Sequence, residues 1–189
     1  MERLPFQVTA AAAPYADIKP LPVTLVAENV RSLYNVGALF RAADGAGIER
    51  LVLVGITGRP PDRGIAKTAL GAEEHVPWEY VPDSVEALER LRAAGYEIAA
   101  VETGLHAVDL FDWTPRFPVC VIFGHELGGL SKAALERADV MVQIPMLGFK
   151  DCLNVATAAG VVLYELLRKY RRALEAMPQL RPNRSGVGR

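Results

Sequence analysis

Five short apolar runs constrain the fold of this chain more than any other feature of its sequence. Within each run, apolar side chains occupy successive positions instead of alternate ones, which is typical of strands that are buried on both faces. Longer helix-like stretches separate the runs. The runs cover residues 23–27, 51–55, 97–101, 119–124 and 140–144, and the helix-like stretches cover residues 36–47, 84–94, 131–138 and 153–176. This alternation predicts an α/β domain in which helices flank a parallel sheet.

The length of the chain fits one domain. Its 189 residues, of which 51% are apolar, can bury one substantial core but are too few for two ordinary domains. We expect the domain to span residues 21–176, between a flexible N-terminal extension (1–20) and a flexible basic C-terminal tail (177–189). Residues 57–71, which are rich in proline and glycine, are expected to form a loop that leads into a short helix.

Membrane and metal-binding classes are disfavoured. Every apolar stretch is far shorter than the roughly 20 residues that a membrane helix needs. The N-terminus lacks the basic head and apolar centre of a signal peptide, so we expect a cytoplasmic protein with no membrane partner. The two cysteines, Cys120 and Cys152, have no CxxC partner and no histidine cluster around them, so neither a zinc site nor a disulfide framework is expected.

The net charge of −1 hides an uneven distribution of charge. From Arg168 to the end of the chain there are seven Lys and Arg residues and one acid, Glu175, whereas acids outnumber bases in the remainder. A segregated basic tail can contact the phosphates of a nucleic acid. A solvated helix end has the same composition, so charge alone leaves both interpretations open.

The last helix-like stretch is apolar nearly all round. On a helical wheel, Leu163 and Leu167 share one face with Gly160, while Val162 and Leu166 lie on the opposite face. Such a helix must be covered on more than one side, by its own sheet or by a second subunit. The pattern therefore favours a homodimer.

Ligands of an open parallel sheet bind beyond the carboxyl ends of its strands, so polar residues just after each apolar run are candidates for a site. After the first run, Asn35 is placed to cap the following helix, and Arg41 points away from the apolar face of that helix. The Arg41 guanidinium is free to bind a phosphate or a ribose. An exposed arginine in a surface ion pair would show the same pattern.

The later runs are followed by glycines and by further polar groups. Thr103 and Gly104 follow the third run, where a glycine permits close approach to a ligand. Gly124 ends the fourth run, and Glu126 follows it; Glu126 could orient a substrate or accept hydrogen bonds from the backbone. His125 between them is expected to make local hydrogen bonds.

The fifth run leads into a segment that suits an adenine ring. Ile144, Met146 and Leu153 offer apolar atoms, and Asn154 carries both a donor and an acceptor at the start of the last helix. Taken singly, each apolar residue also fits a role as core filling.

Three stretches in this order resemble the SpoU (TrmH-like) RNA 2′-O-ribose methyltransferases of the SPOUT class. They are NVGALFR at 35–41, VIFGHELGGLS at 121–131 and VQIPMLGFKDCLNVATAAG at 142–160, and KTALGA at 67–72 is a further similar piece. The resemblance covers residues 21–170. It implies a deep trefoil knot near the C-terminus, a dimer with the active site near the subunit boundary, and S-adenosylmethionine as the cofactor.

The resemblance also assigns roles to the candidate residues. The cofactor pocket would be lined by Thr103, Gly104, Gly124, Ile144, Met146 and Leu153. The reacting ribose would be surrounded by Asn35, Arg41, Glu126 and Asn154. The implied reaction is attack of a ribose 2′-oxygen of tRNA or rRNA on the sulfonium methyl group, which needs no metal. We expect Arg41 to position ribose and phosphate, and its action as the base is a hypothesis, because a guanidinium is a poor base unless its surroundings perturb it.

The chain departs from the family pattern at Cys152, where many members carry serine. A thiol is larger and a weaker hydrogen-bond partner than a hydroxyl. Cys152 is therefore counted among the catalytic candidates, and an alternative hypothesis is a catalytically weak RNA-binding paralogue. A third hypothesis, an unrelated nucleotide-binding hydrolase, is disfavoured because the sequence has neither a phosphate loop nor a nucleophile elbow.

Overall fold

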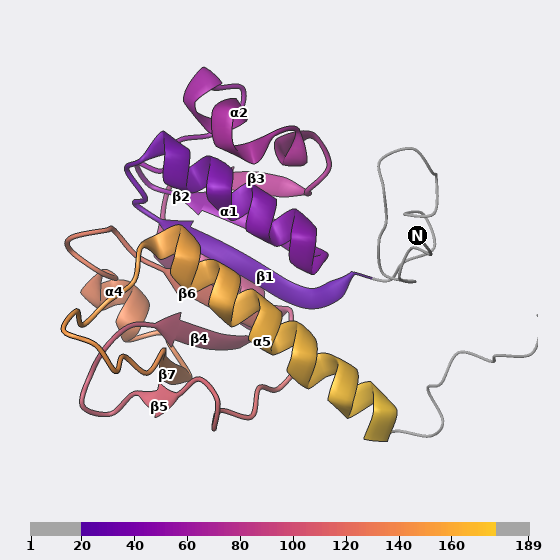
Figure 1. Cartoon of the computed structure of the whole chain (residues 1–189), viewed down its shortest axis with the longest axis vertical. Coiled ribbons are helices and arrows are strands. Elements are labelled where there is room, and N and C mark those ends of the chain that lie inside the picture. Colours follow the sequence, from indigo (N-terminus) through magenta and orange to yellow (C-terminus); the bar gives the residue numbers. More distant parts are fainter. Residues whose placement is uncertain (1–19, 177–189) are drawn as a thin grey trace, which may run out of the picture.

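Seven strands form one sheet at the centre of the computed structural model, which describes residues 20–176 (Figure 1). The strands are β1 (Leu21–Glu28), β2 (Ile48–Val54), β3 (Trp78–Val81), β4 (Glu97–Val101), β5 (Val108–Asp109), β6 (Val119–Phe123) and β7 (Val140–Gln143). Their order is β3-β2-β1-β6-β4-β7-β5, and every neighbouring pair is parallel, which confirms the predicted parallel sheet. The expected tail at 177–189, and the expected extension at 1–20 apart from Pro20, lie outside the described residues.

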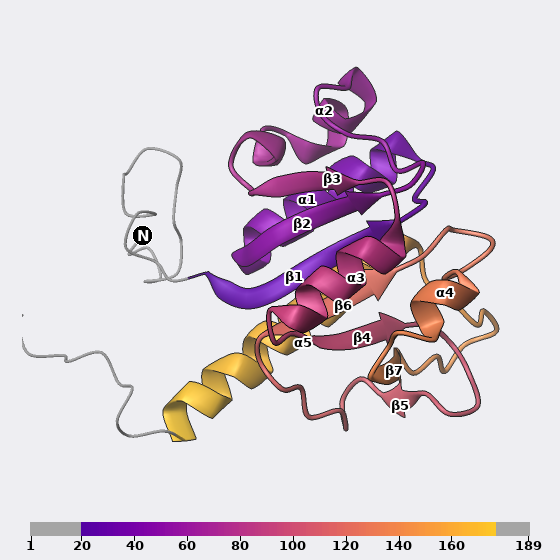
Figure 2. The ribbon, with the colours of Figure 1, turned by 180° about the vertical axis from the view of Figure 1, so that it is seen from behind.

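Helices cover both faces of this sheet. α1 (Leu33–Ala46) and α5 (Val155–Ala176) lie in front of it in Figure 1. α3 (Ser84–Ala93) and α4 (Lys132–Leu135) lie on the opposite face, which Figure 2 shows. α2 (Arg63–Ala69) and the short 3-10 helix η2 (Ala72–Glu74) pack beside α1, at the β3 end of the sheet.

The two layers of helices enclose two hydrophobic cores. In β1, Leu25 and Ala27 belong to the core under α1 and α5, whereas Val26 between them belongs to the core under α3 and α4. All three side chains are fully buried. Burial of a side chain the size of leucine stabilises a fold by about 2 to 3 kcal/mol. Both faces of the sheet therefore contribute to stability, as the successive apolar positions predicted.

All five predicted strands are present, but β3 and β5 were missed. β3 is an edge strand whose Trp78, Glu79 and Tyr80 are only partly buried, and β5 has two residues. Neither forms a continuous apolar run, so a pattern for doubly buried strands does not detect them. The helix expected at 131–138 is shorter than predicted, because α4 covers only Lys132–Leu135.

The start of α1 differs from the prediction that Asn35 caps it. The helix begins at Leu33, and its cap is Ser32, whose hydroxyl accepts a hydrogen bond from the Asn35 backbone N–H (3.3 Å). Asn35 therefore lies inside the first turn, and its side chain is free for other contacts. Gly37 in the next turn allows α2 to pack closely, because a Cβ there would lie 2.2 Å from Thr68 Oγ1.

One side of α5 is covered by the sheet and by α1, and the other is open. Val162, Leu163 and Leu166 are all fully buried, so the covered side of α5 includes residues from both of the faces that the helical wheel distinguished. Tyr164 is 54% exposed, and a Cβ added to Gly160 would meet no atom within 4 Å. No helix among residues 20–176 is both long and apolar enough to cross a membrane.

Candidate active site

Hydrogen bonds join three polar side chains at the carboxyl edge of the sheet. Asn35 Nδ2 donates to Glu126 Oε1 (3.0 Å), and Asn154 Nδ2 donates to Asn35 Oδ1 (3.1 Å). The three residues come from the first turn of α1, the loop after β6 and the position before α5. The structure thus brings together three predicted site residues that are widely separated in the sequence.

Glu126 also binds the backbone at the start of α1. Its carboxylate accepts N–H groups from Arg31 (3.2 Å) and Ser32 (3.1 Å). Partial burial acts to raise the pKa of Glu126, but the hydrogen bonds from Asn35 and from these backbone groups outweigh burial, so its pKa lies below the ordinary value. Glu126 is therefore an ionised carboxylate that fixes the entry to α1, which confirms the expected backbone contacts.

Asn154, the third member of the hydrogen-bonded group, makes two kinds of contact. Its Oδ1 accepts the backbone N–H groups of Ala156 (3.0 Å) and Thr157 (3.3 Å), so it caps the N-terminus of α5. Its Nδ2 meanwhile donates to Asn35. One amide therefore fixes the start of α5 relative to the start of α1.

The loop after β6 folds back tightly on itself. A Cβ on Gly124 would lie 2.3 Å from the backbone of Gly129, so this close approach requires glycine. His125 Nδ1 accepts N–H groups from Leu127 (3.0 Å) and Gly128 (3.1 Å), which confirms its expected local role.

Two carboxylates that the sequence interpretation missed hold this loop against the sheet. Glu28 at the end of β1 is 2% exposed and accepts both the backbone N–H (2.8 Å) and the hydroxyl (2.7 Å) of Ser131. Glu102, just after β4, accepts the backbone N–H of Leu130 (3.2 Å). An acid directly after a predicted apolar run is the sequence signal that could have found both residues, since the runs end at residues 27 and 101.

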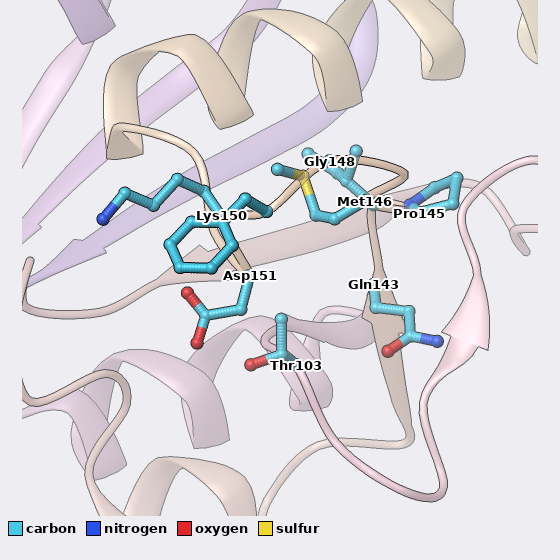
Figure 3. A pocket seen from close by; sticks show the side chains of 9 residues that line it. Thr103, Gln143, Pro145, Met146, Gly148, Lys150 and Asp151 are labelled. Carbon is cyan, nitrogen blue, oxygen red and sulfur yellow. The ribbon is translucent and has the colours of Figure 1, made fainter.

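A pocket of about 360 Å³ lies beside this group, between the ends of β4 and β7 and the segment that leads to α5 (Figure 3). Three predicted cofactor residues, Thr103, Ile144 and Met146, line it. Gly104, Gly124 and Leu153 are not among its lining residues. Gly104 instead allows close packing against Met141, since a Cβ there would lie 3.0 Å from Met141 Sδ.

The rest of the pocket wall was not predicted. Gln143, Lys150 and Asp151 contribute polar groups, and Pro145, Gly148 and Phe149 complete the lining. In the view of Figure 3, Met146 lies above the side chains of Thr103, Gln143 and Asp151. The pocket thus has apolar and polar walls. Among residues 20–176, no group of three His, Cys, Asp or Glu is placed to hold a metal ion.

Two predicted catalytic residues stand apart from the hydrogen-bonded group. Arg41 is exposed on α1, and its side chain makes no hydrogen bond or ion pair with another residue of 20–176. Six residues separate it from Asn35, which turns it about 120° around the helix. Cys152 is an exposed free thiol in the segment between the pocket and Asn154.

Comparisons with known proteins agree on one family. The model of the SpoU rRNA Methylase family matches residues 22–164. The chain is 34% identical over 161 residues to the tRNA (guanosine(18)-2′-O)-methyltransferase of Thermus thermophilus, and the match covers 85% of this chain and 82% of that protein. It is 28% identical over 153 residues to a protein of Staphylococcus haemolyticus assigned to the TrmH family of tRNA/rRNA methyltransferases, covering 81% of this chain and 61% of the relative.

A solved structure gives the same result. The AdoMet-bound rRNA methyltransferase from Sinorhizobium meliloti superposes with a TM-score of 0.73 at 28% identity, and the match covers 79% of this chain and 60% of that chain. The chain therefore spans about three fifths of the length of the Staphylococcus and Sinorhizobium proteins.

Proposed function

The chain belongs to the SpoU rRNA methylase family, and on that basis we propose that it transfers a methyl group from S-adenosylmethionine to a ribose 2′-hydroxyl of tRNA or rRNA. The observation that carries the proposal is the hydrogen-bonded group of Asn35, Glu126 and Asn154, which lies beside a pocket of suitable composition. Each of the three side chains comes from a different family-like stretch. The domain that does this would span residues 21–176.

The lining of the pocket fits S-adenosylmethionine. Ile144 and Met146 provide the apolar wall that an adenine ring requires. Asp151 provides a carboxylate, and the cofactor carries two cationic groups, the sulfonium and the ammonium. When bound, the cofactor supplies an activated methyl group through its positive sulfur. We assign Thr103, Ile144 and Met146 to cofactor binding from the lining, and we retain Gly104, Gly124 and Leu153 as residues that shape the backbone around it.

The asparagines would hold the acceptor ribose. Asn35 Oδ1 and one of its N–H groups are already engaged, and so are Asn154 Oδ1 and one of its N–H groups. Each amide nitrogen keeps one more N–H, which can donate to a ribose oxygen. Because Glu126 fixes Asn35, these donors are oriented before substrate arrives, and alignment of this kind is a large part of catalysis.

Arg41 would bind the phosphate and ribose of the substrate. Its guanidinium is exposed and engages no other described residue, so it is available to an external ligand. Guanidinium groups bind phosphates in fork geometry and stay protonated at neutral pH. Removal of the 2′-hydroxyl proton by Arg41 remains a hypothesis. A cytoplasmic location is proposed with the RNA substrate.

A homodimer is proposed from the exposed apolar groups around the pocket. Leu105, Leu127, Leu147 and Phe149 are 94% or more exposed, and the open side of α5 carries Tyr164. Large apolar side chains that are exposed to this extent are typical of an interaction surface. A partner seated there would complete the pocket wall. The insertion of β6 between β1 and β4, and of β7 between β4 and β5, supports the proposed trefoil knot.

The alternative of a catalytically weak RNA-binding paralogue rests on Cys152. Isothermal titration with S-adenosylmethionine distinguishes the two proposals, because a paralogue without catalysis need not bind the cofactor. We expect binding to the wild-type chain.

The decisive test of activity is methylation. The purified chain is incubated with radiolabelled S-adenosylmethionine and with tRNA or rRNA transcripts, and products are digested to locate a 2′-O-methylated nucleotide. We expect the wild-type chain to methylate RNA, and we expect this activity to be lost in Asn35→Ala. The same assay is run on total RNA from a strain that lacks the gene. If no RNA in that sample accepts a methyl group, the proposed function is overturned.

A further inference from the structure

Positive charge without ion-pair partners collects next to the candidate active site. The described salt bridges join β2, β3, α3, β4, α4 and α5, and they include Arg90 with Glu79 (2.7 Å) and Arg116 with Glu97 (3.4 Å). In contrast, none of the described ion pairs includes four cations on α2 and its neighbouring loops, which are Arg31, Arg59, Arg63 and Lys67. All four side chains are exposed.

Arg31 and the helix α2 lie next to the hydrogen-bonded group. The Arg31 backbone N–H donates directly to Glu126 (3.2 Å). Leu33, two residues later, packs against the start of α2, because a Cβ on Gly64 would lie 2.9 Å from its side chain. Thr68 of α2 donates a hydrogen bond to the Tyr34 carbonyl (2.9 Å). α2 is therefore fixed to the first turn of α1, where Asn35 lies.

Two of the cations, Arg63 and Lys67, lie on the outer face of α2. Ile65 and Ala69 are buried, whereas Arg63, Ala66 and Lys67 are exposed. Arg63 and Lys67 are four residues apart, so their like charges are neighbours on one helix face and weaken the helix. Neither cation takes part in a described ion pair, so both are available to an anionic ligand.

The acids near α2 form no described ion pair with these cations. Asp62 caps the helix by accepting the Gly64 N–H (2.7 Å), and Glu73 accepts the Gly71 N–H (3.0 Å). Glu74 lies beyond the C-terminal end of α2. Arg59, before the helix, rests on the Tyr80 ring with its guanidinium carbon 4.2 Å from the ring centre, which restrains it without removing its charge.

We propose that the exposed face of α2, with Arg31 and Arg59, binds the phosphate backbone of the RNA next to the nucleotide that is methylated. The inference rests on the proposed function and names a surface for its substrate. Phosphate contacts position RNA and carry no sequence information by themselves, so this surface would set the register of the strand on Asn35 and Asn154.

The test compares two double variants that lose the same charge. Arg63→Ala/Lys67→Ala removes the α2 pair, and Arg90→Ala/Arg116→Ala removes two cations from the β3, α3 and β4 region. Affinity for a tRNA transcript is measured by filter binding between about 50 and 200 mM salt, because the salt dependence reports the number of phosphate contacts. S-adenosylmethionine affinity is measured by isothermal titration.

We expect the α2 variant to bind RNA about tenfold more weakly, with a salt slope that is shallower by about one to two units, while the control changes little. Cofactor affinity should be unchanged in both. The converse variant, Ala66→Arg, adds a cation to the same face and should tighten RNA binding and steepen the slope.

Equal affinity and slope in the two double variants would overturn the inference while leaving the methyltransferase proposal intact. If Ala66→Arg left RNA binding unchanged, the α2 face would likewise be excluded. A wild-type chain that bound no RNA would overturn the proposed function, and this inference with it.

Discussion

Asn154 Nδ2 lies 3.1 Å from Asn35 Oδ1, across 119 residues of sequence. This contact joins the N-terminal ends of α1 and α5, two helices that pack against each other on one face of the sheet. Because each amide also holds a second partner, Glu126 or the α5 backbone, neither can rotate without breaking another hydrogen bond. The pair is therefore a fixed element of the site before any ligand binds.

The first prediction concerns coupling between the two asparagines. Asn154→Ala should lower the free energy of unfolding by about 1 kcal/mol through loss of the α5 cap, and Asn35→Ala by a similar amount through loss of its bond to Glu126. Because they share a hydrogen bond, the double variant should lose less than the sum, by about 0.5 kcal/mol or more. Urea denaturation of the four proteins measures this, and strict additivity would contradict it.

The second prediction concerns the pH dependence of stability. The pKa of Glu126 is lower in the folded state than in the unfolded state, because Asn35 and the backbone donors stabilise its charge against the opposing effect of burial. Its contribution is therefore present above the unfolded pKa and is lost as pH falls through the folded pKa. Glu126→Gln should be less stable than wild type by about 1 kcal/mol or more at neutral pH, and the difference should shrink below the ordinary pKa of glutamate.

The measurement for Glu126 is the free energy of unfolding between neutral and acidic pH. Glu136, which is mostly exposed on the C-terminal side of α4, offers a matched control. Glu136→Gln should change stability little at any pH. A deficit in Glu126→Gln that persisted or grew in acid would show that the carboxylate is not held by these donors.

The third prediction uses two glycines with opposite surroundings. Gly124→Ala would force a Cβ to 2.3 Å from the backbone of Gly129, so the loop must move. We expect a loss of stability of about 2 to 4 kcal/mol and weaker S-adenosylmethionine binding by isothermal titration. In Gly148→Ala, in the pocket wall, the added Cβ meets no described atom within 4 Å, so stability should stay within about 0.5 kcal/mol of wild type. Equal effects would refute the steric argument.

The successive apolar positions were sufficient to predict the sheet, because Leu25, Val26 and Ala27 are buried regardless of which strands flank them. They could not predict which strands lie next to each other in the sheet. β6 lies beside β1 although four other strands come between them in the sequence, and this insertion is what brings Glu126 to Asn35. The resemblance identified those residues without predicting their bonds. Glu28 and Glu102 were missed because their partners, Ser131 and Leu130, become close only in the folded chain.

The fourth prediction tests the proposed homodimer through the open side of α5. A Cβ at Gly160 would meet no atom of residues 20–176 within 4 Å, so Gly160→Leu should leave the subunit folded. If a second subunit approaches this face, the added side chain prevents close packing and shifts the protein toward monomer. Sedimentation velocity measures the shift, and Ala176→Leu at the exposed end of the helix is the control. An unchanged dimer in Gly160→Leu would place the interface elsewhere.

The fifth prediction concerns Cys152, the position where the chain departs from its family. The thiol is exposed, so Cys152→Ser should change stability by less than about 0.5 kcal/mol. A hydroxyl is the stronger hydrogen-bond partner, and the residue lies between Asp151 of the pocket wall and Asn154, so we expect the serine variant to methylate RNA faster in single-turnover experiments. Cys152→Ala, which removes the group, should be no faster than wild type. If serine slowed the reaction, the thiol would be an adaptation to this chain's own substrate, and the catalytically weak paralogue would lose its main support.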